Sequence, residues 1–205
     1  PRAGYGTFAI SPDGRRLAAR IFPSSGPPEI WVLGIADGER THIPVAGIVG
    51  VTLKWWPDGD GVLFAEYGSS GRDRVVVRQW LSEDGRRDTV ARGVIHFDAS
   101  GRANLLATAP FPDPGIRTQP LDRSVEPVSL PTGPVAFPRF SPDGRWIAYT
   151  DWAPEESEVK LVRITPPGIP HTLSVHGGEE PTWTPDGRTV IYRNGQQWLA
   201  VTIST

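Results

Sequence analysis

The hydrophobic residues of this chain occur in short continuous runs, each preceded by a turn sequence. In Phe140–Tyr149, for example, the sequence FSPDGRWIAY joins two apolar segments through Ser-Pro-Asp-Gly. In such a turn proline fixes φ, aspartate can hydrogen-bond the backbone ahead of it, and glycine accepts a positive φ. Because the apolar runs do not alternate with polar residues, they predict strands that are buried on both faces. We therefore expect tight hairpins that enter buried sheets.

The same turn recurs along the chain at a nearly constant interval. Its clear copies contain Pro12, Asp13, Gly14; Pro57, Asp58, Gly59; Pro142, Asp143, Gly144; and Pro185, Asp186, Gly187. A degenerate copy lies at Asp98–Arg102, with Ala99 in place of the proline, and the resulting period is 42–45 residues. A fixed period in this range is typical of four-stranded propeller blades. The sequence thus predicts an all-β fold, a β-propeller with five recognisable blade repeats.

The repeat also predicts the domain organisation, because blades bury their faces only against neighbouring blades. We expect one β-propeller domain or fragment over residues 1–205, with blades at about 7–45, 49–91, 93–131, 135–176 and 179–203. The last blade is incomplete, since no fourth strand follows Ile203, and the chain begins in mid-pattern at Pro1. The alternatives are a five-bladed ring whose last blade has three strands and a piece of a six-bladed or larger ring within a longer protein, and we favour the second.

Each repeat has a bulky apolar residue just before its turn, which predicts a core position. These residues are Ile10, Trp55, Phe97, Phe140 and Trp183. The third blade should be the most irregular, because Pro120 lies in its third strand and proline belongs at sheet edges.

Composition and charge narrow the possible partners. The formal net charge of −2 gives no overall attraction to nucleic acid, so we expect no nucleic-acid partner. No apolar run approaches the roughly 20 residues that span a bilayer, which predicts no membrane segment in this chain. The 205 residues contain no cysteine, so neither a disulfide nor a thiolate metal site can form.

Catalytic motifs are absent from the sequence. It has no Gly-x-Ser-x-Gly elbow, no His-Glu-x-x-His, no phosphate loop and no kinase elements. We predict that this chain is not an enzyme and has no catalytic residues, no metal and no cofactor. Asp58–Gly61 only partly matches a calcium loop and is better explained as a variant turn. The paired acids Glu179 and Glu180 are interpreted as solvated, although such a pair can capture a peptide amino terminus.

A basic residue stands immediately before the bulky pre-turn residue in three consecutive repeats: Lys54, His96 and Arg139. The favoured interpretation is that these side chains reach solvent at one rim of the ring. The alternative is a ligand-binding channel mouth that attracts a carboxylate or an acidic peptide. Binding there should strengthen below about pH 6.5, where His96 would gain its charge.

The repeated sequence resembles the TolB-like, or PD40, repeat of the WD40-like propellers, F-S-P-D-G-x-x-I/L-A-Y/F. Phe140–Tyr149 matches it closely, and five copies cover essentially the whole chain. Gly177–Val201 is similar in style to the C-terminal propellers of some bacterial serine/threonine kinases. The resemblance implies a non-catalytic binding or scaffold module, an extracytoplasmic sensor or protein-interaction domain of a larger bacterial protein. Its partner would be a protein or peptide, and it would lie in the periplasm or on the outer face of the inner membrane.

Two alternatives remain open under the same resemblance, because related propellers serve different functions. One is the gating propeller of a prolyl-oligopeptidase-like serine peptidase whose hydrolase domain is absent from these residues. The other is a TolB-like envelope assembly protein.

Overall fold

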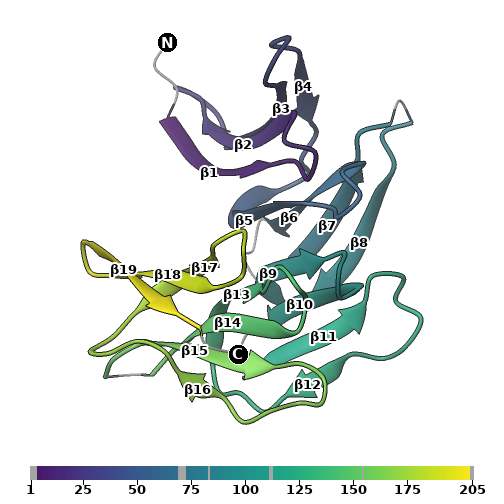
Figure 1. Ribbon diagram of the computed structural model, residues 1–205. Coiled ribbons are helices and arrows are strands. Elements are labelled where there is room, and N and C mark those ends of the chain that lie inside the picture. Colours follow the sequence, from purple (N-terminus) through teal and green to yellow (C-terminus); the bar gives the residue numbers. More distant parts are fainter. Residues whose placement is uncertain (1–3, 69–72, 83, 111–112, 154, 204–205) are drawn as a thin grey trace. The chain divides into compact units, whose positions relative to one another are not determined.

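The computed structural model describes residues 4–68, 73–82, 84–110, 113–153 and 155–203, and every regular element within these ranges is a β-strand (Figure 1). The strands form five antiparallel sheets in which strands adjacent in sequence are also hydrogen-bonded neighbours. This up-and-down order is that of propeller blades, so the predicted all-β class and the five blade repeats are confirmed. The larger ring stays a prediction.

Four sheets have four strands and the fifth has three. The first contains β1 (Gly4–Ile10), β2 (Arg16–Phe22), β3 (Glu29–Gly34) and β4 (Arg40–Ile43). The second contains β5 (Ile48–Trp55), β6 (Gly61–Tyr67), β7 (Arg74–Trp80) and β8 (Arg87–Arg92). The third contains β9 (Val94–Ser100), β10 (Leu105–Pro110), β11 (Ile116–Pro120) and β12 (Val128–Leu130). The fourth contains β13 (Val135–Phe140), β14 (Trp146–Asp151), β15 (Glu158–Arg163) and β16 (His171–Thr172). The fifth contains β17 (Glu179–Trp183), β18 (Thr189–Asn194) and β19 (Gln197–Thr202).

The chain divides into two compact units, Pro1–Ile95 and His96–Thr205. The first unit contains the first two sheets, and the second contains the last two sheets and most of the third. Each unit is described by itself below.

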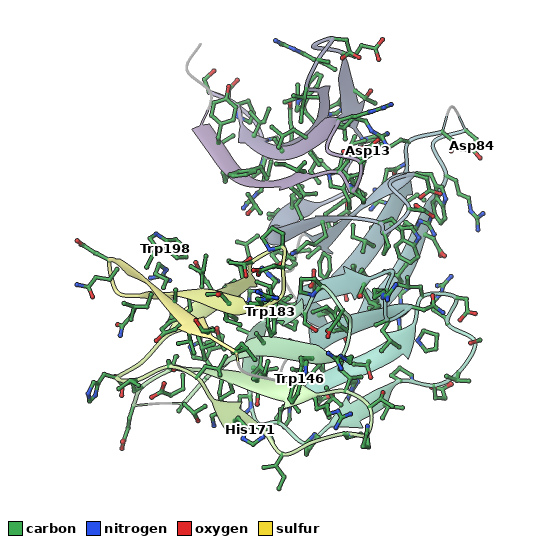
Figure 2. The ribbon with its side chains drawn as sticks, viewed as in Figure 1. Asp13, Asp84, Trp146, His171, Trp183 and Trp198 are labelled. Carbon is green, nitrogen blue, oxygen red and sulfur yellow. The ribbon has the colours of Figure 1, made fainter. Side chains whose placement is uncertain are left out.

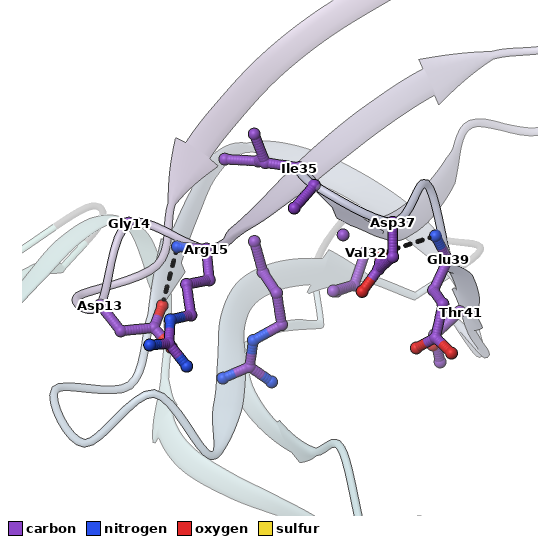
Figure 3. A pocket seen from close by; sticks show the side chains of 11 residues that line it. Asp13, Gly14, Arg15, Val32, Ile35, Asp37, Glu39 and Thr41 are labelled. Carbon is purple, nitrogen blue, oxygen red and sulfur yellow. Dashed lines mark hydrogen bonds between the residues drawn. The ribbon is translucent and has the colours of Figure 1, made fainter.

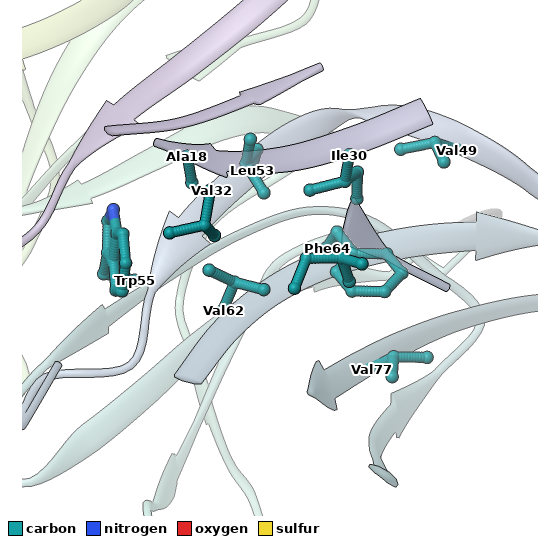
Figure 4. Close-up of a cluster of buried hydrophobic side chains, with 10 residues drawn as sticks. Ala18, Ile30, Val32, Val49, Leu53, Trp55, Val62, Phe64 and Val77 are labelled. Atoms are coloured by element: carbon teal, nitrogen blue, oxygen red, sulfur yellow. The ribbon is translucent and has the colours of Figure 1, made fainter. Parts of the chain in front are cut away.

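The core of the first unit lies between its two sheets. Leu53 and Trp55 of β5 pack with Phe64 of β6 and with Ile30 and Val32 of β3 (Figure 4). All residues of β6 except the last are buried, as expected for a strand covered on both faces. In the second unit β14 shows the same pattern, with its four central residues buried.

The pre-turn residues do not all belong to the core. Trp55, Phe97 and Phe140 are buried, but Ile10 is 59% exposed. The expectation for Ile10 is wrong for a physical reason: the pre-turn side chain packs against the preceding sheet. The indole of Trp55, for example, donates a 2.9 Å hydrogen bond to the carbonyl of Ala9. Among the described residues no sheet precedes the first one. Trp183 is half-buried against the core of the last two sheets.

The turn of the third sheet also differs from the prediction. β9 continues through Ser100, so Asp98 and Ala99 belong to the strand, and the turn itself is Gly101–Asn104. Asp98 is held in the strand because its carboxylate accepts a 2.9 Å hydrogen bond from the backbone N–H of Phe140. Asn104 supplies the positive φ, 54°, that glycine supplies in the other turns. Phe97 is therefore buried without standing directly before a turn.

Two glycines of equivalent turns allow a matched prediction. Gly14 and Gly144 have nearly the same φ, 71° and 73°. A Cβ at Gly14 would meet nothing within 4 Å, whereas one at Gly144 would lie 2.8 Å from the backbone nitrogen of Ala103. Gly14→Ala should therefore lower the free energy of unfolding by about 1 kcal/mol, through backbone strain alone. Gly144→Ala should cost about 2 kcal/mol, because crowding adds to that strain. Urea unfolding followed by circular dichroism checks the order, and equal losses would contradict it.

Candidate functional site

Ionisable side chains gather on the first strands of the last three sheets and on the neighbouring β18. We call these residues the first-strand cluster: His96, Asp98, Arg139, Glu179, Glu180 and Arg193. All of them lie in the second unit. The structure thus brings together two of the three predicted site residues, His96 and Arg139, since the charge of Arg139 acts on His96. The third, Lys54, is half-buried on β5 in the first unit, and its place beside the other two stays a prediction.

Two bulges shape the cluster. The register of β13 on β14 shifts between Ala136 and Arg139, and that of β17 on β18 shifts between Glu179 and Thr182. Within these shifts Phe137 has a φ of 50° and Glu180 a φ of 56°. A positive φ at a residue other than glycine costs on the order of 1–3 kcal/mol and persists only where the surroundings enforce it. For Glu180 part of that enforcement is a 3.0 Å hydrogen bond from its backbone N–H to Thr150 Oγ1.

His96 is buried, with its ring centroid 4.1 Å from that of Phe137. Burial lowers the pKa of His96 to about 4; the charge of Arg139 acts in the same direction, and Glu180 opposes it. The expectation that His96 becomes charged below about pH 6.5 is therefore wrong. The imidazole remains neutral until the pH approaches 4, because a buried cation beside another cation is unfavourable.

Arg139 is held in place by its neighbours. Burial lowers the pKa of Arg139, while the carboxylates of Asp98 and Glu180 act against that shift. Its Nη1 donates a 2.8 Å hydrogen bond to the carbonyl of Pro138, and its own carbonyl accepts one of 3.1 Å from the indole of Trp183. The guanidinium is thus fixed close to two carboxylates.

The paired acids Glu179 and Glu180 share a cation. Arg193 Nη2 lies 2.8 Å from Glu179 Oε2 and 3.2 Å from Glu180 Oε1. With His96 neutral, the cluster contains three carboxylates and two guanidinium groups, so its formal charge is −1. These residues alone do not make a cationic site. No signal in the sequence reveals this arrangement, because the bulges fall on Phe137 and Glu180 rather than on glycine.

The two aspartates of the possible calcium loop, Asp58 and Asp60, are paired with an arginine side chain. Arg78 Nη2 lies 2.6 Å from Asp60 Oδ1 and 3.6 Å from Asp58 Oδ2. Its guanidinium stacks between Trp56 and Trp80, at 3.9 Å and 4.0 Å from the ring centroids. In the described part of the chain no group of three or more His, Asp or Glu side chains could hold a metal ion. Nor do the described ranges contain a helix long and apolar enough to cross a membrane.

A pocket of about 550 Å³ lies beside the first turn, within the first unit (Figure 3). Two of its acidic residues stabilise the turns around it. Asp13 Oδ1 accepts a 3.0 Å hydrogen bond from the backbone N–H of Arg15, and Asp37 Oδ1 accepts one of 2.9 Å from the backbone N–H of Glu39. Arg16, which also lines the pocket, donates a 2.7 Å hydrogen bond to the carbonyl of Gly59. The pocket is therefore built largely from groups that stabilise the hairpins.

No protein-family model matches this sequence, and no curated protein matches it either. Several solved structures, in contrast, are similar to the structure of this chain. TolB from Acinetobacter baumannii is 22% identical, with a TM-score of 0.71, and the match covers 96% of this chain and 51% of TolB. A putative TolB from Agrobacterium tumefaciens is 17% identical, with a TM-score of 0.72, and the match covers 92% of this chain and 69% of that one. A chain of a nidogen/laminin complex is 13% identical, with a TM-score of 0.71, and the match covers 97% of this chain and 75% of that one.

The chain thus spans about half the length of the first of these proteins, 51%. At such identities structural likeness establishes the fold and leaves activity and partners open. The similarity in style to kinase propellers stays a prediction. What the strand order and the structural matches together establish is that this chain has the β-propeller fold of the TolB-like proteins.

Proposed function

We propose that this chain is a non-catalytic binding module, an extracytoplasmic sensor or protein-interaction domain of a larger bacterial protein. It would recognise a protein or peptide through the first-strand cluster, and a contribution from Lys54 stays a prediction. One of the structures that it resembles belongs to a complex, that of nidogen and laminin, which supports the use of this fold for protein binding. The structural likeness itself carries only the fold, so the proposal rests on the site.

The observation that carries the proposal is the pair of bulges that hold Phe137 and Glu180 at positive φ. Bulges of this kind re-aim side chains and are frequent beside functional sites. Here they lie beside Arg139 and the paired acids Glu179 and Glu180, whose positions are thereby fixed before any partner arrives. A site that is already ordered loses less conformational entropy on binding, which favours recognition of a polar peptide.

Calorimetric titration with two synthetic peptides, one rich in glutamate and one rich in lysine, tests the proposal. At least one should bind, and Arg139→Gln should weaken that binding by about 10-fold, because a hydrogen bond to a charged group contributes about 1.5–3 kcal/mol. Lys54→Gln should weaken it as well if Lys54 belongs to the same site. Arg163→Gln is the matched control, since Arg163 is exposed on β15 outside the cluster. If neither peptide binds, or if Arg139→Gln binds like the unmodified chain, the cluster is not the recognition site.

The flanking sequence of the full gene separates the alternatives. A kinase domain with a single membrane helix would indicate sensing, and a hydrolase domain with Gly-x-Ser-x-Gly would indicate the peptidase propeller. A signal peptide with a small N-terminal domain would indicate the envelope assembly protein. Because Arg193 already contacts both Glu179 and Glu180, the described residues offer no observation that favours the peptidase.

A further inference from the structure

Three turns of the second unit pack in a row: Gly101–Asn104, Pro142–Arg145 and Pro185–Arg188. The first two touch where a Cβ at Gly144 would lie 2.9 Å from that of Ala103. The last two touch where a Cβ at Gly187 would lie 3.5 Å from Pro142 Cδ. Beside this row is a pocket of about 520 Å³, which we call the turn pocket. Its volume lies in the range of small-molecule sites, roughly 300–1,000 Å³.

The turn pocket has a surplus of positive charge. It is lined by three arginines, Arg102, Arg145 and Arg188, and by two aspartates, Asp143 and Asp186. Arg145 Nε lies 2.6 Å from Asp143 Oδ2, so this arginine is already paired. Arg102 and Arg188 form no salt bridge with any residue in the described ranges. The formal charge of the lining is therefore +1, and within the described ranges two guanidinium groups retain free donors.

The aspartates remain ionised under mildly acidic conditions. The hydrogen bond from Thr184, followed by that from the backbone N–H of Arg188, holds the pKa of Asp186 below its usual value. Burial raises the pKa of Asp143, but hydrogen bonds from Ser141 and Arg145 outweigh this effect and leave it lowered. The charge of the pocket is thus constant near neutral pH, and an anionic ligand would compete with only these two groups.

Apolar side chains complete the lining of the pocket. Trp146 and Trp183, which are labelled in Figure 2, are both half-buried, and Ile203 lies with them. Trp183 donates its indole N–H to the carbonyl of Arg139, so what remains for a ligand is its ring surface. Flat aromatic groups pack well against such rings, with about 0.5–1.5 kcal/mol beyond the burial of their area.

The pocket beside the first turn shows that this combination is not general to the repeat. That pocket is lined by three acids, Asp13, Asp37 and Glu39, against two arginines, and no tryptophan lines it. One of its arginines, Arg16, is already bound to the carbonyl of Gly59. Its formal charge of −1 would repel an anion that the turn pocket attracts.

We infer that the turn pocket is a binding site for an anion attached to a flat apolar ring, that is, an aromatic carboxylate or an aromatic phosphate ester. The anion pairs with Arg102 and Arg188, whose planar guanidinium groups match both oxyanions. The ring packs against Trp146 and Trp183. This site shares no residue with the first-strand cluster, so it is independent of the proposed function.

Calorimetric titration of the intact chain with benzoate and with phenyl phosphate is the direct test. Both should bind, and affinity should fall between about 50 mM and about 300 mM NaCl, because exposed charges are screened by salt. Benzyl alcohol, which keeps the ring and lacks the charge, should bind at least about 10-fold more weakly. Comparing the affinity of a peptide that ends in phenylalanine with that of its C-terminal amide shows whether the terminal carboxylate of a protein chain also binds in the turn pocket.

Variants assign the binding to the pocket. Arg102→Gln combined with Arg188→Gln should weaken benzoate binding by at least about 10-fold, through the loss of two charged hydrogen-bond donors. Arg163→Gln and Arg139→Gln should bind benzoate like the unmodified chain, which separates this site from the first-strand cluster. Circular dichroism verifies that each variant is folded. Trp146→Phe is a milder variant, because it keeps an aromatic side chain in the lining of the turn pocket. Absence of binding by both anions, equal binding of benzyl alcohol, or unchanged binding by the double variant would each overturn the inference.

Discussion

Replacing Phe140 by alanine is expected to lower the free energy of unfolding by about 3–5 kcal/mol. Phe140 ends β13, is 8% exposed, and packs with Ile147, Tyr149 and Val162 in the core of the third and fourth sheets. Its removal leaves a cavity that neighbouring strands cannot fill, because their positions are fixed by hydrogen bonds on both sides. The loss should appear as a lower midpoint in urea unfolding, followed by circular dichroism.

The matched control is Phe8→Ala, which removes the same side chain from β1. Phe8 is 67% exposed in the described structure, so its truncation deletes few contacts and should cost less than about 1 kcal/mol. Trp183→Ala should fall between the two, since Trp183 is half-buried. Equal losses for Phe8 and Phe140 would contradict the assignment of the core to the contacts between consecutive sheets.

The fold could be predicted from the sequence because the same local pattern, a turn followed by an apolar run, occurs in each repeat. Each Pro-Asp-Gly turn specifies a tight hairpin by itself, and each apolar run specifies a buried strand by itself. Where that local signal is degenerate, prediction fails. Asp98–Arg102 resembles the turn in its letters, yet Asp98 is kept in β9 by a hydrogen bond from Phe140, 42 residues later in the chain.

The site could be predicted only in part, for the same reason. That His96 and Arg139 lie near each other follows from their similar places in adjacent repeats. Their electrostatic environment does not, because it depends on Asp98 and on the bulge at Glu180, which is held by Thr150 of the neighbouring sheet. Burial of a side chain between sheets likewise depends on whether a sheet precedes it, which explains why Ile10 and Phe140 differ in exposure.

The free energy of unfolding should fall by about 3 kcal/mol as the pH drops from 6.5 to 4, through His96 alone. The pKa of His96 is about 4 in the folded chain, against the usual 6.5. Between these values the unfolded chain binds a proton that the folded chain does not, so acid favours unfolding. The contribution is fully present above pH 6.5 and is lost as the pH falls towards 4. The groups that face the imidazole are Arg139, whose charge opposes protonation, and Glu180, whose charge favours it.

Urea unfolding at a series of pH values between 7 and 4.5 measures this slope while avoiding the range in which Asp13, Asp143 and Asp186 protonate. Burial raises the pKa of Asp58, another turn aspartate, so its contribution to the slope has the opposite sign. Asp13, Asp143 and Asp186 have pKa values below the usual 3.8, so their contribution is lost only at lower pH. His96→Gln should remove most of the slope, even if loss of the contact with Phe137 lowers the stability at every pH. His171→Gln should leave it in place, because His171 is exposed on β16 (Figure 2). A slope that survives His96→Gln would show that another group titrates on unfolding and that the imidazole is not held neutral by burial.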